Sequence, residues 1–443
     1  MLDVMDIFQK LSEAMSEKEY IRLLDKMVSS RNKDLRDIGK RKLRETRFLT
    51  RLMNDDDWTV RHFLARFEFT APYMLAALAH DKNLAVVLAV ALNMRTPEYA
   101  LKQLESHESM AVKYALILNK KSAFDGVMIE DKNLELLAWL MEYMNTFNEI
   151  NEMAEALNDG SIDADDEEAR SYGATMFFAH IRAIEHLERS SDMDIRYWAT
   201  ANKKIVLEGY DGLSQAAESE YGELDADDFL DKLYLADTRA EYNAVLETMK
   251  AHKNQEIREL YRTKRAEVSF LGRLANSKDW QMRFFIANFE PAPAYLLGEL
   301  SHDTQLEVLL SVAANSATPK EGFEQLAKRK DLGISYTLML NEIVPESICI
   351  ERATNTSLPA LLADFLFEFT RFNDFFPSSF SVSVSYDDSF TKRMLDRAYT
   401  ALKKNLKRLE NYGDPDVKEW AKYNLLMITE SMDKLRANSG YEV

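Results

Sequence analysis

A long stretch of this chain occurs twice, and the second occurrence lies 222 residues after the first. Residues 48–104 return as residues 270–326, and the offset holds without a gap over residues 3–119 of the first copy. It holds again near the ends of the copies, where Trp198 corresponds to Trp420. The sequence therefore predicts a tandem duplication. Two residues 222 positions apart are called equivalent below.

A shorter period of 26 residues runs inside each copy. It relates Leu52, Leu78 and Leu104, and also Trp58, Leu84 and Met110. A fixed period of about 20–50 residues is typical of solenoids, whose repeats bury their apolar faces against their neighbours. Residues 84–92 are wholly apolar, and Thr96-Pro97 after them predicts the start of another helix. We therefore expect an all-α fold, specifically an α-solenoid of short helical repeats.

The repeat resembles a known family pattern. The residues that carry the resemblance are Val60-Arg61, Leu64-Ala65, Leu78-Ala79, Asp81, Asn93 and Thr96-Pro97. Together they resemble the leucine-rich repeat variant, a relative of the HEAT-like helical repeats. The resemblance implies a helical-repeat architecture and no particular activity. The period of 26 is longer than the unit of that family, and the cysteine cluster that holds an iron–sulfur centre in some members is missing. We expect no cofactor.

Composition narrows the class of protein further. Only 13 Gly and 9 Pro among 443 residues favour helices over a turn-rich β fold. The single cysteine, Cys349, excludes a disulfide framework and a thiolate metal cage, and it suits a reducing compartment. The longest apolar run, residues 84–92, is shorter than the roughly 20 residues that a membrane helix needs. The acidic N-terminus lacks the basic region of a signal peptide, so we expect a cytoplasmic protein with no membrane partner.

The net charge of −18 is concentrated in two acidic blocks. Residues 133–169 hold eleven acids and residues 205–231 hold nine, without a Lys or Arg in either block, so the rest of the chain carries +2. The preferred interpretation is that the blocks are solvated faces and linker; the alternative is that they attract a basic partner. We expect a first helical-repeat half at 1–208, an acidic linker at 209–224 and a second half at 225–443.

Motifs that carry catalysis or metal binding are missing from the sequence. There is no phosphate-binding glycine-rich loop, no His-Glu-x-x-His and no Cys-x-x-Cys. His180 and His186 are six residues apart and do not share a helix face, so we expect no metal site and no catalytic residues. Asp57, Trp58 and Arg61 offer one enzyme interpretation, because helical DNA alkylation-repair glycosylases also use Trp, Asp and Arg. We prefer a structural role, in which Asp and Arg bond to a neighbouring repeat and Trp packs between repeats.

The two copies differ most where the first has its acidic block at 133–169. At equivalent positions the second copy is rich in phenylalanine, and Ser378–Tyr386 alternates as a short strand or an extended loop would. Phe365, Phe369, Phe372 and Phe376 have the spacing of a buried helical stripe, whereas Phe367, Phe375 and Phe380 do not fit it. The candidate partner-binding residues are Phe367, Phe375, Phe376, Phe380, Asp163, Asp165, Asp166, Glu167 and Glu168.

Three hypotheses about function follow. The first is a non-enzymatic helical-repeat scaffold that binds another protein. The second is an acidic inhibitor or immunity-type protein that neutralises a basic partner such as a nuclease. The third and weakest is a nucleic-acid base-excision enzyme of HEAT-like fold, which would need a basic groove that the sequence does not indicate. We therefore expect a protein partner with basic character and no nucleic-acid partner.

Overall fold

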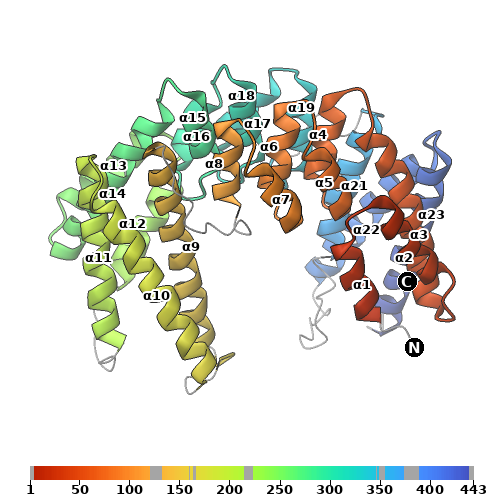
Figure 1. Cartoon of the computed structure of the whole chain (residues 1–443), viewed down its shortest axis with the longest axis horizontal. Coiled ribbons are helices and arrows are strands. Elements are labelled where there is room, and N and C mark those ends of the chain that lie inside the picture. The colour runs from red at the N-terminus through yellow and green to blue at the C-terminus, as the bar shows by residue number, and fades with distance from the viewer. Residues whose placement is uncertain are drawn as a thin grey trace. The chain divides into compact units, whose positions relative to one another are not determined.

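The structure is a computed structural model that describes residues 4–119, 132–158, 160–162, 166–213, 223–345, 347–348, 355–373 and 389–438. Helices are the only regular secondary structure in these ranges, which confirms the predicted all-α class (Figure 1). Within the same ranges, no helix is both long and apolar enough to cross a membrane.

The chain divides into two compact units. Unit 1 comprises Met1–Gln103 and Phe323–Val443, and unit 2 comprises Leu104–Gly322. Each unit thus combines helices from both predicted sequence halves. The division of the chain into these halves stays a prediction, based on the similarity between the two sequence copies. Helix α11 extends to Leu213, so it covers the beginning of the predicted acidic linker, and residues 214–222 lie outside the described residues.

The helices of unit 1 are α1 (Val4–Glu13), α2 (Glu17–Val28), α3 (Lys33–Met53), α4 (Trp58–Arg66), α5 (Pro72–Leu78), α6 (Leu84–Leu92), α7 (Glu98–Leu104), α18 (Lys320–Ala327), α19 (Leu332–Leu340), α21 (Leu358–Asn373), α22 (Ser389–Glu410) and α23 (Pro415–Asn438). Those of unit 2 are α8 (Met110–Leu118), α9 (Lys132–Asn158), α10 (Glu167–Leu187), α11 (Met193–Leu213), α12 (Glu223–Tyr234), α13 (Arg239–Lys250), α14 (Gln255–Ala275), α15 (Trp280–Asn288), α16 (Ala294–Leu300) and α17 (Leu306–Ala314). Helices α7 and α18 lie at the boundary between the units.

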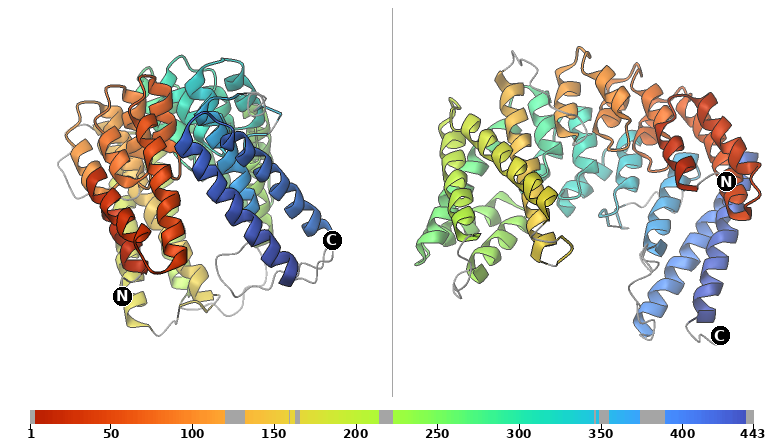
Figure 2. Two further views of the ribbon diagram at one scale, coloured as in Figure 1. Left: turned by 90° about the vertical axis from the view of Figure 1, so that its right-hand side faces the viewer. Right: turned by 60° about the horizontal axis from the view of Figure 1, so that its bottom comes forward.

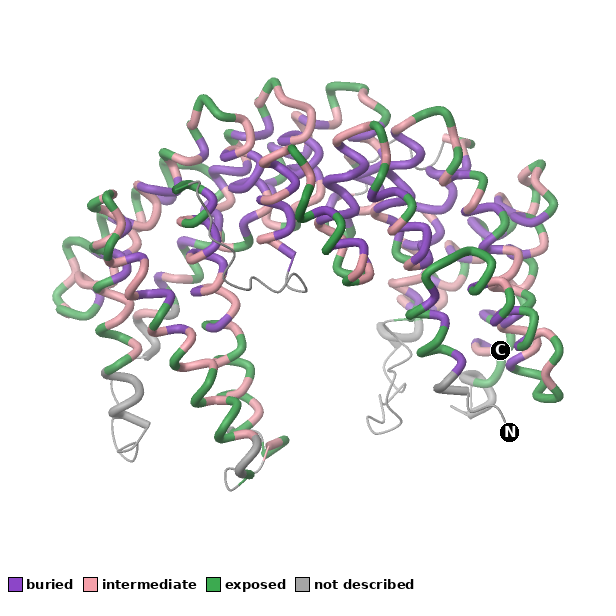
Figure 3. The backbone as a smooth tube through the Cα atoms, in the orientation of Figure 1, coloured by how far each residue is buried: buried purple, intermediate pink, exposed green. Residues whose placement is uncertain are grey.

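Short polar side chains set where the repeat helices begin. Asp57 accepts a hydrogen bond from the N–H of Thr59 at the start of α4, and Asn83 accepts one from Ala85 at the start of α6. Such caps satisfy amide groups that have no partner inside the helix. Helix α6 is apolar on all sides and buried from Ala85 to Ala91, as Figure 3 shows by colour. The 26-residue apolar pattern therefore corresponds to short, buried helices separated by polar turns.

Recurring polar residues of the 26-residue pattern also link helices that are distant in the chain. The side-chain amide of Asn93, after α6, donates to the carbonyl of Ala65 at 2.7 Å, and the equivalent Asn315 donates to Ala287 at 2.9 Å. Thr96 is fully buried and its hydroxyl donates to the carbonyl of Val90 at 2.6 Å. This bond gives a carbonyl near the end of α6 a hydrogen-bond donor. The sequence predicted a different role for Thr96, as the N-terminal cap of the next helix. The hydroxyl favours a carbonyl at the end of the preceding helix, which has no partner inside that helix.

Unit 1 is held together by the packing of α3 against α23. Trp420 of α23 is 1% exposed, and its indole N–H donates to the carboxylate of Glu45 on α3 at 2.9 Å. The indole ring also lies 5.4 Å from the ring of Phe48. At the edge of this contact, Arg44 and Arg51 of α3 bond to Asp416 at 3.0 and 3.1 Å. Figure 2 shows α22 and α23 side by side, and α23 also packs against α3.

Unit 2 repeats this arrangement with equivalent residues. The indole N–H of Trp198 on α11 donates to Glu267 on α14 at 3.1 Å, and its ring lies 5.7 Å from Phe270. Arg273 bonds to Asp192 and Asp194 at 2.6 Å each. Each of these residues lies 222 positions from its counterpart in unit 1. The buried tryptophans of the fold are therefore Trp198 and Trp420, whereas Trp58 and Trp280 are only half-buried.

Candidate functional site

Several predicted partner-binding residues lie outside the described ranges. They are Phe375, Phe376, Phe380, Asp163 and Asp165, and Ser378–Tyr386 falls outside as well. Helix α10 begins at Glu167 and Glu168. Asp166, just before them, is exposed, and its carboxylate accepts a hydrogen bond from the N–H of Ala169 at 3.3 Å. Asp166 therefore lies at the start of α10, where a carboxylate favours the positive end of the helix dipole.

The aromatic stretch of the second copy forms α21. Phe365 and Phe372 are 1% and 2% exposed, which confirms the predicted buried stripe for these two residues. Phe367 is half-buried, and the guanidinium of Arg371 lies 5.3 Å from the centre of its ring. Phe367 belongs to unit 1, whereas Asp166 belongs to unit 2.

The recurring Asp and Arg residues make structural bonds. The Arg61 guanidinium contacts both carboxylate oxygens of Asp81, at 2.6 and 3.0 Å, and it also donates to the carbonyl of Asp55. Arg283 pairs with Asp303 in the same way, at 2.6 and 3.1 Å. Asp81 lies between α5 and α6, so Arg61 of α4 bonds to the turn before another helix, whereas Asp57 caps its own helix α4.

The two histidines singled out by the sequence have separate surroundings. His186 stacks on Trp139, with ring centres 3.9 Å apart. His180 is fully buried, and its Nδ1 lies 2.9 Å from the hydroxyl oxygen of Thr146. Burial lowers the pKa of His180 to about 4, because the charged imidazolium loses its hydration there. His180 is therefore a neutral core residue near neutral pH.

The buried neutral His180 makes the stability of unit 2 depend on pH. Its pKa in the unfolded chain is about 6.5, so its contribution is complete above that pH and is lost as the pH falls toward 4. His180→Leu introduces the residue found at equivalent position 402. We expect the unfolding free energy of this variant to fall less steeply with falling pH than that of the wild type, by up to about 1.4 kcal/mol per pH unit. Hydrogen exchange of α9 and α10 between pH 7 and pH 5 measures the effect. The same slope in variant and wild type would contradict this assignment.

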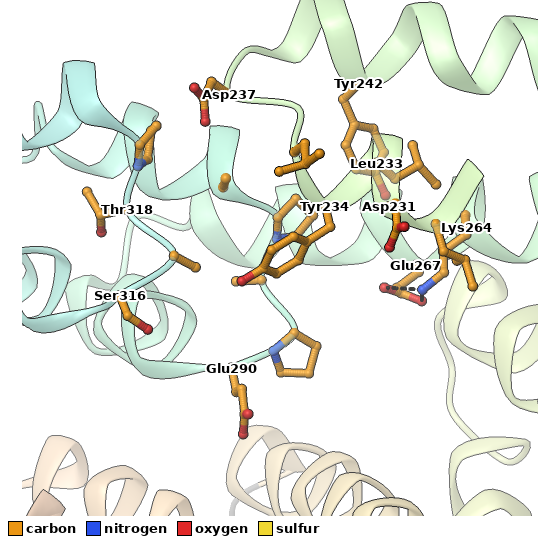
Figure 4. Close-up of a pocket in the computed structure, with 18 of the residues that line it drawn as sticks. Asp231, Leu233, Tyr234, Asp237, Tyr242, Lys264, Glu267, Glu290, Ser316 and Thr318 are labelled. Carbon is orange, nitrogen blue, oxygen red and sulfur yellow. Dashed lines mark hydrogen bonds and ion pairs between the residues drawn. The ribbon is translucent and has the colours of Figure 1, made fainter. Parts of the chain in front are cut away.

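Unit 2 contains a pocket of about 630 Å³ (Figure 4). Its walls come from the end of α12 and the turn after it, from α13 and α14, and from the segments at the starts of α16 and α18. The lining residues are Leu230, Asp231, Leu233, Tyr234, Leu235, Asp237, Tyr242, Lys264, Glu267, Glu290, Pro291, Ala292, Pro293, Ala294, Ser316, Ala317, Thr318, Pro319 and Lys320. The volume is within the range of about 300–1,000 Å³ usual for ligand sites.

The pocket combines apolar walls with carboxylates that have no partner. Among the described residues, no hydrogen bond or ion pair engages the side chains of Asp231, Asp237 or Glu290. Burial raises the pKa of Asp237, and the negative charges of Glu321 and Glu241 raise it further. Glu267, in contrast, accepts hydrogen bonds from Lys264 and from the indole of Trp198.

Two large apolar side chains at the rim are exposed to solvent. Tyr234 and Leu235, at the end of α12, are 74% and 72% exposed. Figure 4 shows Tyr234 beside the lining residues of the pocket, with Asp231 and Asp237 on the same segment. The arrangement can hold a group that is apolar along its length and positively charged at its end.

The equivalent place in unit 1 is occupied by an aromatic ring. Phe69 is equivalent to Pro291, and its ring packs 6.2 Å from Phe365 and 6.0 Å from Phe369. The ammonium of Lys42 lies 5.5 Å from the same ring. A proline at position 291 has neither the size nor the reach of this side chain. The pocket therefore lies at a point where the two copies differ.

Sequence reasoning did not find this pocket. Its residues come from five separate segments, and none of the 19 belongs to the predicted partner-binding set. Two differences between the copies mark this pocket in the sequence. Pro291 stands where the first copy has Phe69, and Asp237 stands where it has Met15. The acidic block at 205–231 ends at Asp231, so it does reach the rim.

Comparisons with known proteins gave no match: none to a protein family, none to a curated protein and none to a solved structure. The described residues contain no group of three or more His, Cys, Asp or Glu side chains placed to hold a metal ion. The case for a function therefore depends on the pocket and on the equivalent contacts of the two units.

Proposed function

We propose that this protein is a non-enzymatic helical-repeat scaffold, an α-solenoid arising from a tandem duplication, that binds another protein. The equivalent contacts of Trp198 in unit 2 and Trp420 in unit 1 support the duplication. The resemblance to leucine-rich repeat variant and HEAT-like repeats supports the solenoid. In such proteins stacked helices form extended surfaces suited to binding a partner.

The observation that carries the proposal is the unpaired acidity of the unit 2 pocket. Four carboxylates and two ammonium groups line it, and three of the carboxylates have no partner among the described residues. A lysine or arginine of the partner would offset this charge, while the aliphatic part of its side chain packs on Pro291 and Leu235. The partner segment is therefore basic and apolar, with at least one cationic side chain flanked by hydrophobic ones.

The same acidity favours the second hypothesis as a special case. An inhibitor or immunity-type protein that neutralises a basic partner such as a nuclease would use carboxylates of this kind. Phe367 and Asp166 remain candidate partner-binding residues, each within its own unit. A base-excision enzyme is not favoured, because an acidic pocket repels the phosphate backbone of a nucleic acid.

The test uses an array of short peptides in which a central Arg, Lys, Gln or Glu is flanked by leucines. We expect the purified protein to retain the Arg and Lys peptides and to release them as salt rises, because attraction between exposed charges is screened over about 8–10 Å at physiological salt. Asp237→Asn with Glu290→Gln should weaken binding by about tenfold or more. Pro291→Phe, which introduces the residue found at equivalent position 69, should block the pocket.

The matched control is Glu68→Gln. Glu68 is equivalent to Glu290 and is likewise exposed, but it lies in unit 1. We expect this variant to bind as the wild type does. Equal binding of Gln and Arg peptides, or equal loss in Glu68→Gln and Glu290→Gln, would reject the pocket as the binding site.

A further inference from the structure

One face of helix α4 in unit 1 holds three buried polar atoms that have no hydrogen-bond partner among the described residues. They are the hydroxyl oxygen of Thr59, Nδ1 of His62 and Nε of Arg66. The residues are three and four positions apart, a spacing that places their side chains on the same side of a helix. Thr59 is 6% exposed and His62 is 3% exposed, whereas Arg66 is half-buried and reaches solvent.

Leaving these groups unpaired costs free energy. A buried donor or acceptor without a partner loses its hydration and gains nothing in return. Burial is also the sole cause that lowers the pKa of Arg66, to about 10, with no carboxylate opposing it. Burial, followed by the charge of Arg66, lowers the pKa of His62 to about 3. The face therefore presents an uncompensated positive charge beside a neutral imidazole.

The second copy shows that this helix does not need such groups for packing. The residues equivalent to Thr59, His62 and Arg66 are Gln281, Phe284 and Asn288. Phe284 is 1% exposed, and the side-chain amide of Asn288 donates to the carbonyl of Phe284 at 2.8 Å. The rest of the helix is alike in both copies, since Asp279 caps α15 as Asp57 caps α4. The polar face is thus specific to the first copy.

We propose that the Thr59–His62–Arg66 face of α4 binds an oxyanion, a phosphate or carboxylate group. The Arg66 guanidinium supplies charge and planar N–H donors, the arrangement that carboxylates and phosphates accept best. A neutral His62 protonated on Nδ1 donates one further hydrogen bond, and the Thr59 hydroxyl donates another. The anion enters from the side on which the half-buried Arg66 reaches solvent. This site is independent of the unit 2 pocket and of the partner proposed for it.

The experiment measures binding of inorganic phosphate, sulfate and acetate to the full chain by calorimetry, with sodium chloride holding the ionic strength constant. We expect saturable one-to-one binding of at least one of these anions. Stronger binding of phosphate or sulfate than of acetate assigns the site to phosphate groups, and the reverse assigns it to carboxylates. Heats no larger than those of sodium chloride would overturn the proposal. Ordered water, and not an anion, would then be the hydrogen-bond partner of the three atoms.

Three variants make the test specific. Arg66→Asn and His62→Phe introduce the residues of the second copy, and we expect them to weaken binding by about tenfold or more. Thr59→Val preserves size and removes only the hydroxyl, which keeps the test valid if another variant unfolds. The matched control is Lys33→Asn, which removes an exposed charge from α3 of the same unit. Equal weakening by Lys33→Asn would show nonspecific attraction and overturn the proposal.

Discussion

Replacing Trp420 with alanine should lower the unfolding free energy of unit 1 by about 3–5 kcal/mol. The side chain is 1% exposed and lies between Phe48 and Phe365, whose ring centres are 5.4 and 4.8 Å from its own. Its loss would leave a cavity between α3, α21 and α23 and would remove the N–H that bonds to Glu45. Urea denaturation measures the free energy, and hydrogen exchange of α3 and α23 locates the loss.

The equivalent residue provides the matched comparison. Trp198→Ala should cause a similar loss, but with reduced protection in α11 and α14 of unit 2, because Trp198 packs between those helices. Trp58→Ala should cost less than either change, since Trp58 is half-buried. If Trp420→Ala reduced protection in α11 and α14 but not in α3 and α23, the packing described for unit 1 would be wrong.

Replacing Asp81 with alanine should cost about 3–5 kcal/mol, because it leaves the buried Arg61 guanidinium without its counter-charge. The two side chains are 7% and 8% exposed. Burial by itself raises the pKa of Asp81, but hydrogen bonds from Arg61 and from the N–H of Asn83, with the charge of Arg61, lower it below its usual value. The carboxylate therefore stabilises unit 1 above about pH 4, and this contribution is lost as the pH falls further. Thermal and urea unfolding of the variant measure the loss.

Two further variants separate the charge from the packing. Asp303→Ala removes the equivalent carboxylate, and we expect a smaller loss because the side chain of Arg283 is 17% exposed. The double variant Arg61→Met with Asp81→Leu should be more stable than Asp81→Ala, since apolar residues of similar volume can replace a buried ion pair. A double variant as unstable as Asp81→Ala would show that packing, and not unpaired charge, causes the loss.

Both proposed binding sites lie where equivalent residues of the two copies differ. Pro291 replaces Phe69 at the unit 2 pocket, and His62 replaces Phe284 on the polar face of α4. The helices around these positions keep their caps and their ion pairs in both units. Local differences of this kind between equivalent positions leave the shared packing of the two units intact.

Much of the fold could be predicted from the sequence because its determinants are local. Asp57 and Asn83 cap helices through amides two residues away, and the apolar run 84–92 forms a buried helix. The site could not be predicted in the same way. The pocket is lined by residues from five separate segments, whereas the notable run of phenylalanines is in part a buried stripe on α21.

The sequence by itself determined the all-α class, because the apolar runs and polar caps that define short helices lie only a few residues apart. The Arg61–Asp81 pair joins residues only 20 positions apart, but no sequence pattern predicted Asp81 as the partner of Arg61. Only the tertiary structure decided that the end of one copy packs on the beginning of the other. The bond from Trp420 to Glu45 joins residues 375 positions apart, and the equivalent bond from Trp198 to Glu267 spans 69. An apolar helix face must be covered by another element, but the apolar residues do not specify which element covers it. The reason is that the hydrophobic effect depends on the area buried and has no direction. Shape and the indole N–H, matched to a carboxylate on the facing helix, select that partner in each unit.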